Sequence, residues 1–303
     1  MRIVAALGGN ALARRGQEIS AQVQRANLAE AARALAPLVR DHELTITHGN
    51  GPQVGLLLLE SEADPSVAPY PLDVLGAESE GMVGYLLEQA LRNELPDARF
   101  ATLLTQTAVD AEDPAFAAPS KPVGPLYNAA TARRLERERG FVVRADTGGW
   151  RRVVPSPEPL RILQRDAIEL LAAAGVTVIA AGGGGVPVVL DAAGRPRGVE
   201  GVIDKDLTAA LLAENLDAEL LLLLTDVDAV YRDFDTPAAC ALPALTASEA
   251  DELLASGQLD AGSMAPKVDA AARFARAGGT AIVSSLERVG EALGGAAGTR
   301  VSS

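Results

Sequence analysis

Short apolar runs alternate with longer amphipathic stretches along most of the chain. The apolar runs have the length and composition of buried strands, and they lie at residues 3–7, 44–47, 99–104, 176–181, 220–225 and 280–284. The stretches between them have helical periodicity, and they lie at residues 21–39, 52–60, 76–95, 160–174, 207–216, 247–255, 267–277 and 286–293. Strands that alternate with helices in this way form parallel sheets joined by crossover connections. The pattern therefore predicts an α/β sandwich.

Composition allows a large folded core. With 303 residues and 48% hydrophobic side chains, the chain can form one large α/β domain or two closely packed lobes. Its one cysteine, Cys240, rules out a disulfide framework and a cysteine-based zinc site, and we expect it to be a small, partly buried apolar side chain. No basic leader precedes the first strand, and no apolar stretch approaches the roughly 18 residues of a membrane span. We therefore expect a soluble, cytoplasmic protein.

The chain is acidic, with a formal net charge of −13. A general affinity for nucleic acid or for anionic membranes requires a basic face, so we expect neither as a partner. Any anionic ligand must instead meet positive charge that is concentrated locally.

Residues 110–159 interrupt the alternation of strands and helices. This interval is rich in proline, and it contains the sequence KPVGP at residues 121–125 and a charged helical stretch near residues 129–139. Insertions in α/β enzymes commonly form lids over the site. We expect residues 110–159 to form an inserted lid subdomain.

Lysine is scarce in this chain. Of 27 basic residues only Lys121, Lys205 and Lys267 are lysines. Where positive charge alone is needed the chain uses arginine, so a position that keeps lysine calls for a compact ammonium group on a flexible stem. Lys121 lies in a Pro/Gly loop of the insertion. We interpret all three lysines as functional groups, and three chance surface positions are the alternative.

Two of these lysines lie where helices begin. We expect Ser263 to be the N-cap of the helix that contains Lys267, and the helix that contains Lys205 to start near Asp204. The N-terminal end of a helix carries partial positive charge, so a cation there is mildly unfavourable unless an anion binds at the same end. The simplest interpretation is that Lys205 and Lys267 face phosphate groups.

Glycine clusters follow three of the expected strands. They lie at residues 8–9, 49–51 and 182–185. In an open parallel sheet the carboxyl ends of the strands face the ligand, and glycines there let backbone N–H groups approach an anion closely. Three clusters at one edge indicate an extended anionic ligand, although each cluster alone is also common as a simple turn.

Several common nucleotide and hydrolase motifs are missing from the sequence. It contains no G-x-x-x-x-G-K-[ST], and the first turn lacks the G-x-G-x-x-G of dinucleotide-binding proteins. The two histidines, His42 and His48, are too few for a histidine metal centre, and G-x-S-x-G is absent. These absences disfavour Walker-type ATPases, Rossmann dehydrogenases and serine hydrolases.

Six segments together resemble the carbamate kinases of the amino-acid kinase superfamily. They are GGNAL at residues 8–12, THGNGPQVG at 47–55, KPVGP at 121–125, GWRRVVPSP at 149–157, IDKD at 203–206 and GSMAPK at 262–267. The second, third and fourth segments are distinctive of carbamate kinases, whereas the last two recur more widely in the superfamily. The resemblance spans nearly the whole chain.

The resemblance implies a fold, an assembly and a reaction. The fold is a three-layer αβα sandwich around a mainly parallel sheet of about eight strands, with a small lid subdomain that protrudes over the acceptor site. The assembly is a homodimer. The reaction is reversible transfer of a phosphoryl group between ATP and carbamate, which gives ADP and carbamoyl phosphate. Residues 1–109 and 160–180 would then bind the acceptor, and residues 181–303 the nucleotide.

The resemblance also implies catalytic roles for Lys205, Lys267, Lys121 and Asp206. The two helix-start lysines would flank the transferring phosphate. Asp206 would hold Lys205 in position, although Asp204 could do so instead or could merely cap the helix. Lys121 would contact the acceptor or the transferred group when the lid closes, and a solvated charge near a hinge is the alternative.

Binding residues follow from the same resemblance. The acceptor would be held by backbone or amide N–H groups of Gly8, Gly9, Asn10, Gly49, Asn50 and Gly51. The nucleotide would be held by Asp226, Val227, Asp228, Tyr231, Met264 and Lys267, of which Tyr231 could equally be a core residue. Mg²⁺ would be held mainly by the nucleotide phosphates, so we name no protein ligand for it.

Other functions remain open at this point. Another acyl-phosphate-forming kinase of the superfamily would keep the nucleotide half and change the acceptor half. A non-catalytic sensor of carbamoyl phosphate or nucleotide could dispense with some of the lysines. A dehydrogenase would respond to a nicotinamide cofactor.

Overall fold

A computed structural model of the chain describes residues 1–9, 17, 20–64, 66–260 and 262–303. Its strands are β1 (Arg2–Leu7), β2 (Glu43–His48), β3 (Phe100–Thr102), β4 (Gln106–Ala108), β5 (Lys121–Tyr127), β6 (Val142–Asp146), β7 (Gly149–Val154), β8 (Arg161–Ile162), β9 (Thr177–Ile179), β10 (Val186–Leu190), β11 (Pro196–Gly198), β12 (Leu220–Thr225), β13 (Val230–Arg232), β14 (Cys240–Leu242), β15 (Ala244–Thr246), β16 (Thr280–Ser285) and β17 (Thr299–Ser302). Its helices are α1 (Ala21–Asp41), α2 (Gly51–Ser61), α3 (Leu72–Glu94), η2 (Pro114–Phe116), α4 (Ala129–Arg139), α5 (Arg165–Ala173), η3 (Gly182–Gly184), α6 (Lys205–Asn215), α7 (Ala247–Ala255), α8 (Met264–Arg276), η4 (Leu286–Arg288) and α9 (Val289–Leu293).

The main sheet has eight strands in the order β15-β17-β16-β12-β1-β2-β9-β3. All six strands expected from the apolar runs lie in it, and they are parallel to one another. The other two strands are at one edge, where β17 runs antiparallel to β16 and β15 pairs parallel with β17. The prediction of a mainly parallel eight-stranded sheet is confirmed.

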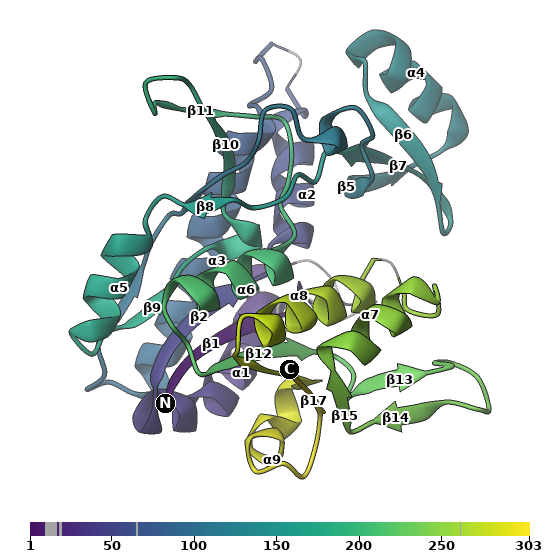
Figure 1. Cartoon of the computed structure of the whole chain (residues 1–303). Helices are drawn as coiled ribbons and strands as arrows, with labels where there is room; N and C mark the ends of the chain where they lie inside the picture. The colour runs from purple at the N-terminus through teal and green to yellow at the C-terminus, as the bar shows by residue number, and fades with distance from the viewer. Residues whose placement is uncertain (10–16, 18–19, 65, 261) are drawn as a thin grey trace.

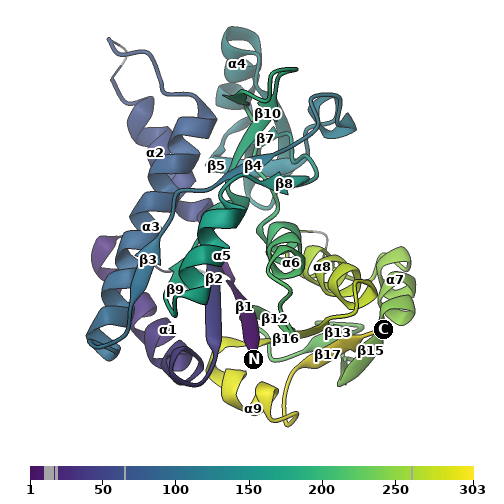
Figure 2. The same cartoon turned by 60° about the vertical axis from the view of Figure 1, so that its left-hand side comes forward.

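Both faces of this sheet are covered by helices. Side chains alternate along each strand, so Val4 and Ala6 of β1 pack with α5, α6, α7 and α8, whereas Ile3 and Ala5 pack with α1, α3 and α9. Figures 1 and 2 show these helices as separate layers on the two faces. Strands buried on both faces have to be apolar throughout, which is why the sequence shows them as continuous runs. The three-layer αβα sandwich is confirmed.

Four of the expected helices differ clearly from the observed ones. Helix α3 begins at Leu72, four residues before the expected start. Residues 161–162 form β8, which pairs with β4, and the expected helix from residue 160 begins only at Arg165. Helix α8 begins at Met264, three residues before the expected start. Residues 286–293 divide into η4 and α9. The errors at α5 and at residues 286–293 arise because a strand of two residues or a break within one turn leaves no periodicity in the sequence.

The interval of residues 110–159 contains a separate small unit. Strands β5, β7 and β6 form an antiparallel sheet with α4, and Figure 1 shows this unit standing away from the main sheet. A second sheet, β11-β10-β4-β8, lies at the same end of the molecule. Lys121 was expected in a loop but is the first residue of β5. The prolines that suggested a loop are tolerated there because the strand is irregular, with a register shift between Val123 and Tyr127 and a left-handed Gly124.

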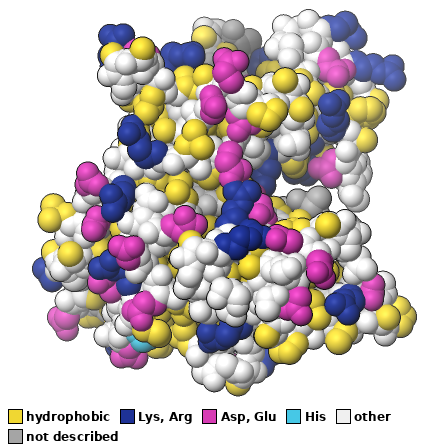
Figure 3. All heavy atoms as spheres, in the orientation of Figure 1, with side chains coloured by type: hydrophobic (Ala, Val, Ile, Leu, Met, Phe, Trp, Pro, Cys, Tyr) yellow, Lys and Arg dark blue, Asp and Glu magenta, His cyan; other side chains and the backbone are white. Residues whose placement is uncertain are grey.

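The surface carries charges of both signs. Figure 3 shows basic and acidic side chains interspersed on the face turned to the viewer, and a hollow between the β5-β7-β6 unit above and α7 and α8 below. In the part of the chain that the structure describes, no helix is long and apolar enough to cross a membrane. Cys240 is exposed, so the expectation of a partly buried side chain is wrong: it lies in the short hairpin β13–β14, away from the core.

Candidate active site

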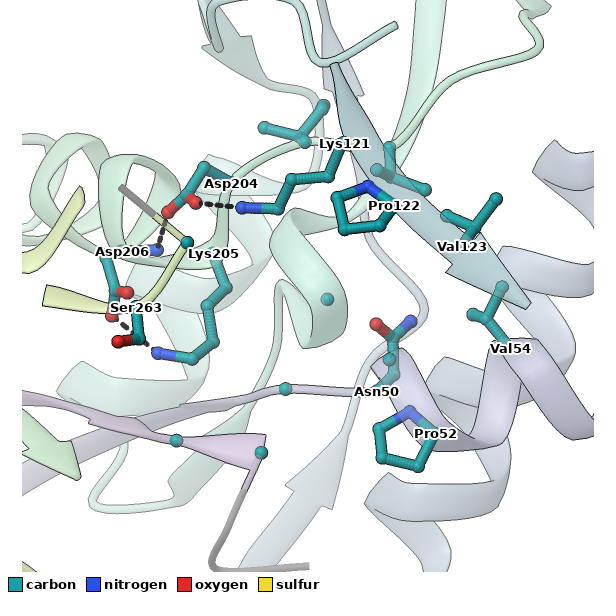
Figure 4. A pocket seen from close by; sticks show the side chains of 18 of the residues that line it. Asn50, Pro52, Val54, Lys121, Pro122, Val123, Asp204, Lys205, Asp206 and Ser263 are labelled. Atoms are coloured by element: carbon teal, nitrogen blue, oxygen red, sulfur yellow. Dashed lines mark hydrogen bonds and ion pairs between the residues drawn. The ribbon is translucent and has the colours of Figure 1, made fainter. Parts of the chain in front are cut away.

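A cavity of about 300 Å³ opens at the carboxyl ends of β1, β2 and β12. Its walls are the glycine turns after β1 and β2 on one side, the starts of α6 and α8 on another, and the first residues of β5 above. Figure 4 shows Lys121 and Lys205 reaching into this space from β5 and α6. The cavity therefore lies where a parallel sheet presents its ligands.

The glycine turns bring backbone segments into close contact. Gly8 N–H donates to the Leu224 carbonyl at 2.8 Å, and a Cβ atom on Gly8 would lie 2.9 Å from that oxygen. A Cβ atom on Gly49 would lie 3.2 Å from the backbone of Gly9. Of the residues expected to bind the acceptor, Gly8, Gly9, Gly49, Asn50 and Gly51 line the cavity. The sixth, Asn10, lies outside the described residues.

One carboxylate joins the two helix-start lysines. Asp206 Oδ1 accepts from Lys205 Nζ at 2.5 Å, and Asp206 Oδ2 accepts from Lys267 Nζ at 3.1 Å. The Asp206 side chain is 5% exposed and that of Lys267 7%, so these charges are almost out of contact with solvent. Removing one partner from a buried ion pair typically costs about 3–5 kcal/mol, so each of these groups depends on the others.

The electrostatics of this cluster favour a further anion. Burial alone would raise the pKa of Asp206, but the two ammonium groups outweigh it and hold that pKa below its ordinary value. Burial lowers the pKa of Lys205, Asp206 opposes the shift, and the neighbouring Lys267 adds to it. Two cations share one carboxylate, so the cluster carries net positive charge on the cavity wall.

Asp204 has a different task from Asp206. Its Oδ1 accepts from the backbone N–H of Asp206 at 2.9 Å, which caps α6, and its Oδ2 accepts from Lys121 Nζ at 2.6 Å. Asp204 therefore links the β5-β7-β6 unit to the start of α6, as the dashed lines in Figure 4 show. Of the two carboxylates considered for Lys205, the contact is made by Asp206.

The start of α8 differs in detail from the expectation. Ser263 is the N-cap residue, but its side chain makes no capping hydrogen bond to the helix. Its hydroxyl donates instead to Asp260 Oδ1 at 2.8 Å, and its carbonyl accepts from Lys267 Nζ at 3.1 Å. The capping position of Ser263 was predicted correctly, but its side chain bonds to the loop before the helix instead of to the helix itself.

A second cavity, of about 170 Å³, adjoins the first. Thr225, Asp226 and Ser263 line both cavities, and the walls of the second are otherwise mostly apolar. Of the residues expected to bind nucleotide, Asp226, Val227, Tyr231 and Met264 line this second cavity, and Lys267 lines the first. Asp228 lines neither, and it accepts from the Tyr231 hydroxyl at 2.7 Å and from Arg288 at 3.0 Å.

Two buried titratable residues next to the glycine turns, Glu80 and His48, were assigned no functional role from the sequence. Glu80 of α3 accepts from the backbone N–H of Gly182 at 2.9 Å and of Thr105 at 3.2 Å, and burial raises its pKa to about 8. Burial lowers the pKa of His48 to about 4, so the ring is neutral near pH 7. The one sequence signal for Glu80 was its position on the apolar stripe of its helix, three residues before the buried Val83.

Comparison with known proteins defines the class of this chain. The model of the amino acid kinase family matches residues 1–283. The chain therefore belongs to the amino acid kinase family, and it is a phosphotransferase.

Close relatives narrow the class further. Carbamate kinase of Haemophilus influenzae is 48% identical over 99% of this chain and 96% of its own length, and carbamate kinase of Halobacterium salinarum is 50% identical over 98% and 97%. The solved structure of carbamate kinase from Giardia lamblia bound to AMP-PNP superposes with a TM-score of 0.92, with 39% identity over 99% of this chain and 98% of that one. Within the family, the chain groups with the carbamate kinases.

The buried Glu80 predicts a pH dependence of stability. Between about pH 4.5 and pH 8 the folded chain keeps a proton on Glu80 that the unfolded chain has lost, so this residue makes the free energy of unfolding fall as pH rises through that window. In Glu80→Gln this contribution is gone, and the stability of the variant relative to the wild type should increase from pH 5 to pH 8. Urea unfolding of both proteins at four or five pH values measures this difference in the free energy of unfolding.

The control for this experiment is Glu78→Gln, which changes an exposed carboxylate on the same helix. The free energy of unfolding of this variant should change with pH in the same way as that of the wild type. Parallel curves for Glu80→Gln as well would contradict the assignment of a protonated, buried Glu80.

Proposed function

We propose that the chain catalyses reversible phosphoryl transfer between ATP and carbamate, giving ADP and carbamoyl phosphate. The observation that carries the proposal is the pair of ammonium groups held by Asp206 on the wall of a cavity that faces the glycine turns. Identities of 46–50% to carbamate kinases over nearly the full chain support it.

The reaction suits the side chains that line the first cavity. Carbamate already carries a nucleophilic carboxylate oxygen, so phosphoryl transfer needs no general base. Among the lining residues that the structure describes, none is a histidine or cysteine. Two anions have to be brought together, and the charge on the transferred group has to be stabilised by positioned cations and backbone donors. Lys205 and Lys267 would supply those cations, and Asp206 would keep both in place.

The two cavities suggest where the substrates bind. Carbamate or carbamoyl phosphate would lie against Gly8, Gly49 and Asn50, and adenosine would lie in the apolar cavity beside Tyr231 and Met264, with the phosphates at the shared wall. Residues 1–109 and 160–180 then form the acceptor part and residues 181–303 the nucleotide part. Residues 110–159 form the lid.

Mg²⁺ would come with the nucleotide. The ion keeps several waters and is commonly held through substrate phosphates, and it would neutralise charge on the phosphates during transfer. Asp204 and Asp206 fit this arrangement, because both are bonded to lysines and neither is left to act as the main ligand.

Lys121 would act from the lid. Its ammonium group forms an ion pair with Asp204, on the same cavity wall as Lys205. A short movement of the flexible side chain would bring this ammonium group to the acceptor or to the transferred phosphoryl group. We also propose a homodimer in the cytoplasm, on the resemblance to carbamate kinases.

One assay tests the function. The purified protein is mixed with ADP, Mg²⁺ and carbamoyl phosphate, and ATP is measured by a coupled luminescence reaction. We expect ATP to form. A parallel reaction with acetyl phosphate as the donor, and reactions of ATP with glutamate or aspartate in which ADP is measured, test the related kinases. Nucleotide binding without any turnover would support a sensor and would overturn the proposal.

Lys205→Ala and Lys267→Ala should each lower kcat at least about 100-fold, the scale of losing one contact to the transition state. Lys205→Arg should also be poor, because a planar guanidinium group cannot replace a point ammonium. Steady-state kinetics in the direction of ATP formation measure these effects. The control is Arg276→Ala, at the exposed end of α8. Rates near the wild type in a lysine variant, with Arg276→Ala also unchanged, would remove that lysine from the mechanism.

Lys121→Ala should weaken the use of carbamoyl phosphate while the KM for ADP stays nearly unchanged, because Lys121 reaches the cavity from the lid and lies outside the lining of the apolar cavity. The matched control is Arg144→Ala, which removes an exposed cation from the same small sheet. A raised KM for ADP with normal use of carbamoyl phosphate would move Lys121 to the nucleotide side.

A further inference from the structure

Asn50 occupies a capping position but does not cap. It is the N-cap residue of α2, and its carbonyl accepts from Val54 N–H at 2.9 Å, as a helix start requires. An asparagine at this position usually turns its side-chain oxygen back to a backbone N–H of the first turn. The Asn50 side chain makes no such bond, so its amide has another task.

A buried serine fixes the orientation of that amide. Ser79 of α3 is fully buried, and its hydroxyl donates to the Gly76 carbonyl at 2.7 Å. A hydroxyl group has one proton, so towards Asn50 the Ser79 oxygen can only accept. Asn50 must therefore present its NH₂ group, and Asn50 Nδ2 lies 2.8 Å from Ser79 Oγ. The choice between the two ends of the amide follows from this network.

A glycine holds the amide from another side. Gly183 has φ +66°, and a Cβ atom there would lie 2.2–2.4 Å from the amide atoms of Asn50. The glycine turn therefore packs directly against the amide, and a side chain at this position would displace the amide. Figure 4 shows the Asn50 side chain at the start of α2, with its nitrogen on the side of Val54 and its oxygen on the side of Lys205.

We infer that Asn50 Oδ1 accepts a hydrogen bond from the amino group of carbamate or carbamoyl phosphate, and that Ser79 is the positioning residue that turns Oδ1 towards it. The inference rests on the proposed function. The phosphoryl and carboxylate oxygens of the substrates need donors, which the glycine turns and the lysines supply. The amino group of the same substrates needs an acceptor.

Few side-chain acceptors on the wall of the first cavity can meet that need. Asp204 and Asp206 are bonded to lysines. Among the lining residues that the structure describes, the other oxygen-bearing side chains are Thr225, Asp226 and Ser263, and they lie where the first cavity meets the second. Asn50 lies beside the glycine turns. The expectation that Asn50 offers a backbone or amide N–H to the acceptor stays a prediction, and the inference adds a role for its amide oxygen.

This arrangement has a consequence for selectivity. Acetyl phosphate differs from carbamoyl phosphate by a methyl group in place of the amino group. In the acetyl complex Oδ1 would face that methyl group without a donor, and a polar group left unpaired on binding lowers affinity and rate. Asn50 would therefore favour the carbamoyl substrate over its acetyl counterpart.

The test compares the two donors in ATP synthesis, with Asn50→Ala and Ser79→Ala. We expect the ratio of kcat/KM for carbamoyl phosphate to kcat/KM for acetyl phosphate to fall about 10-fold or more in Asn50→Ala, the scale of one unpaired buried hydrogen bond. In Ser79→Ala it should fall several-fold, because the amide is free to turn over. The KM for ADP should stay within about twofold in both. The control is Ser284→Ala, another fully buried serine outside both cavity walls, which should keep the wild-type ratio.

Two results would overturn the inference. Equal losses with both donors in Asn50→Ala would give Asn50 a purely structural role, and an unchanged ratio in Ser79→Ala would remove the positioning role of Ser79. If the wild type makes ATP from carbamoyl phosphate in either case, the proposed function stands while the inference fails.

A binding measurement tests the inference even if the protein proves not to make ATP. Calorimetric titration with phosphonoacetamide, which carries a carbamoyl NH₂ group, is compared with titration with 2-oxopropylphosphonate, which carries a methyl group there. The wild type should prefer the amide, and Asn50→Ala should lose the preference. If the wild type makes no ATP but shows this preference, the inference stands and the proposed function fails. No preference in the wild type would overturn the inference.

Discussion

The contact on which the site depends is the sharing of one buried carboxylate by two ammonium groups. Asp206 brings together Lys205 and Lys267, which start two different helices, and it keeps both cations at helix ends that alone would disfavour them. The cost of burying three charges is met only because each has a partner. Since one negative charge faces two positive ones, the cavity wall keeps an excess of positive charge in a chain that is strongly acidic as a whole.

Lys205 and Lys267 lie in regular helices, so no unusual backbone conformation is needed at the lysines themselves. Helix α6 follows β11 of the second sheet and α8 follows α7, yet the two helices pack together and start at the cavity beside the carboxyl ends of β1, β2 and β12. Unusual backbone is concentrated in the opposite wall. The turn that contains Gly183 has several residues with positive φ, and it packs against Asn50 and lies above Glu80. One wall thus supplies charge, and the other supplies closely packed backbone.

Much of this could be predicted from the sequence, for physical reasons. Strands buried on both faces are apolar throughout, so the six central strands were evident, and the scarcity of lysine pointed to Lys205 and Lys267. The strands of the small sheets were missed because runs of two to seven residues show no clear period, and β5, β10 and β11 also contain prolines. Contacts such as Lys121 with Asp204, or Asn50 with Ser79, join residues far apart in the sequence, and no local pattern reports them.

Asp204 touches two parts of the molecule with its two oxygens, and it thereby couples them. One oxygen completes the first turn of α6, and the other holds Lys121 at the start of β5. Without the ion pair to Lys121, Asp204 would keep only its bond to the N–H of Asp206, and the turn that carries Lys205 would lose part of its restraint. The placement of the β5-β7-β6 unit and the order of the first turn of α6 are thus linked through a single side chain.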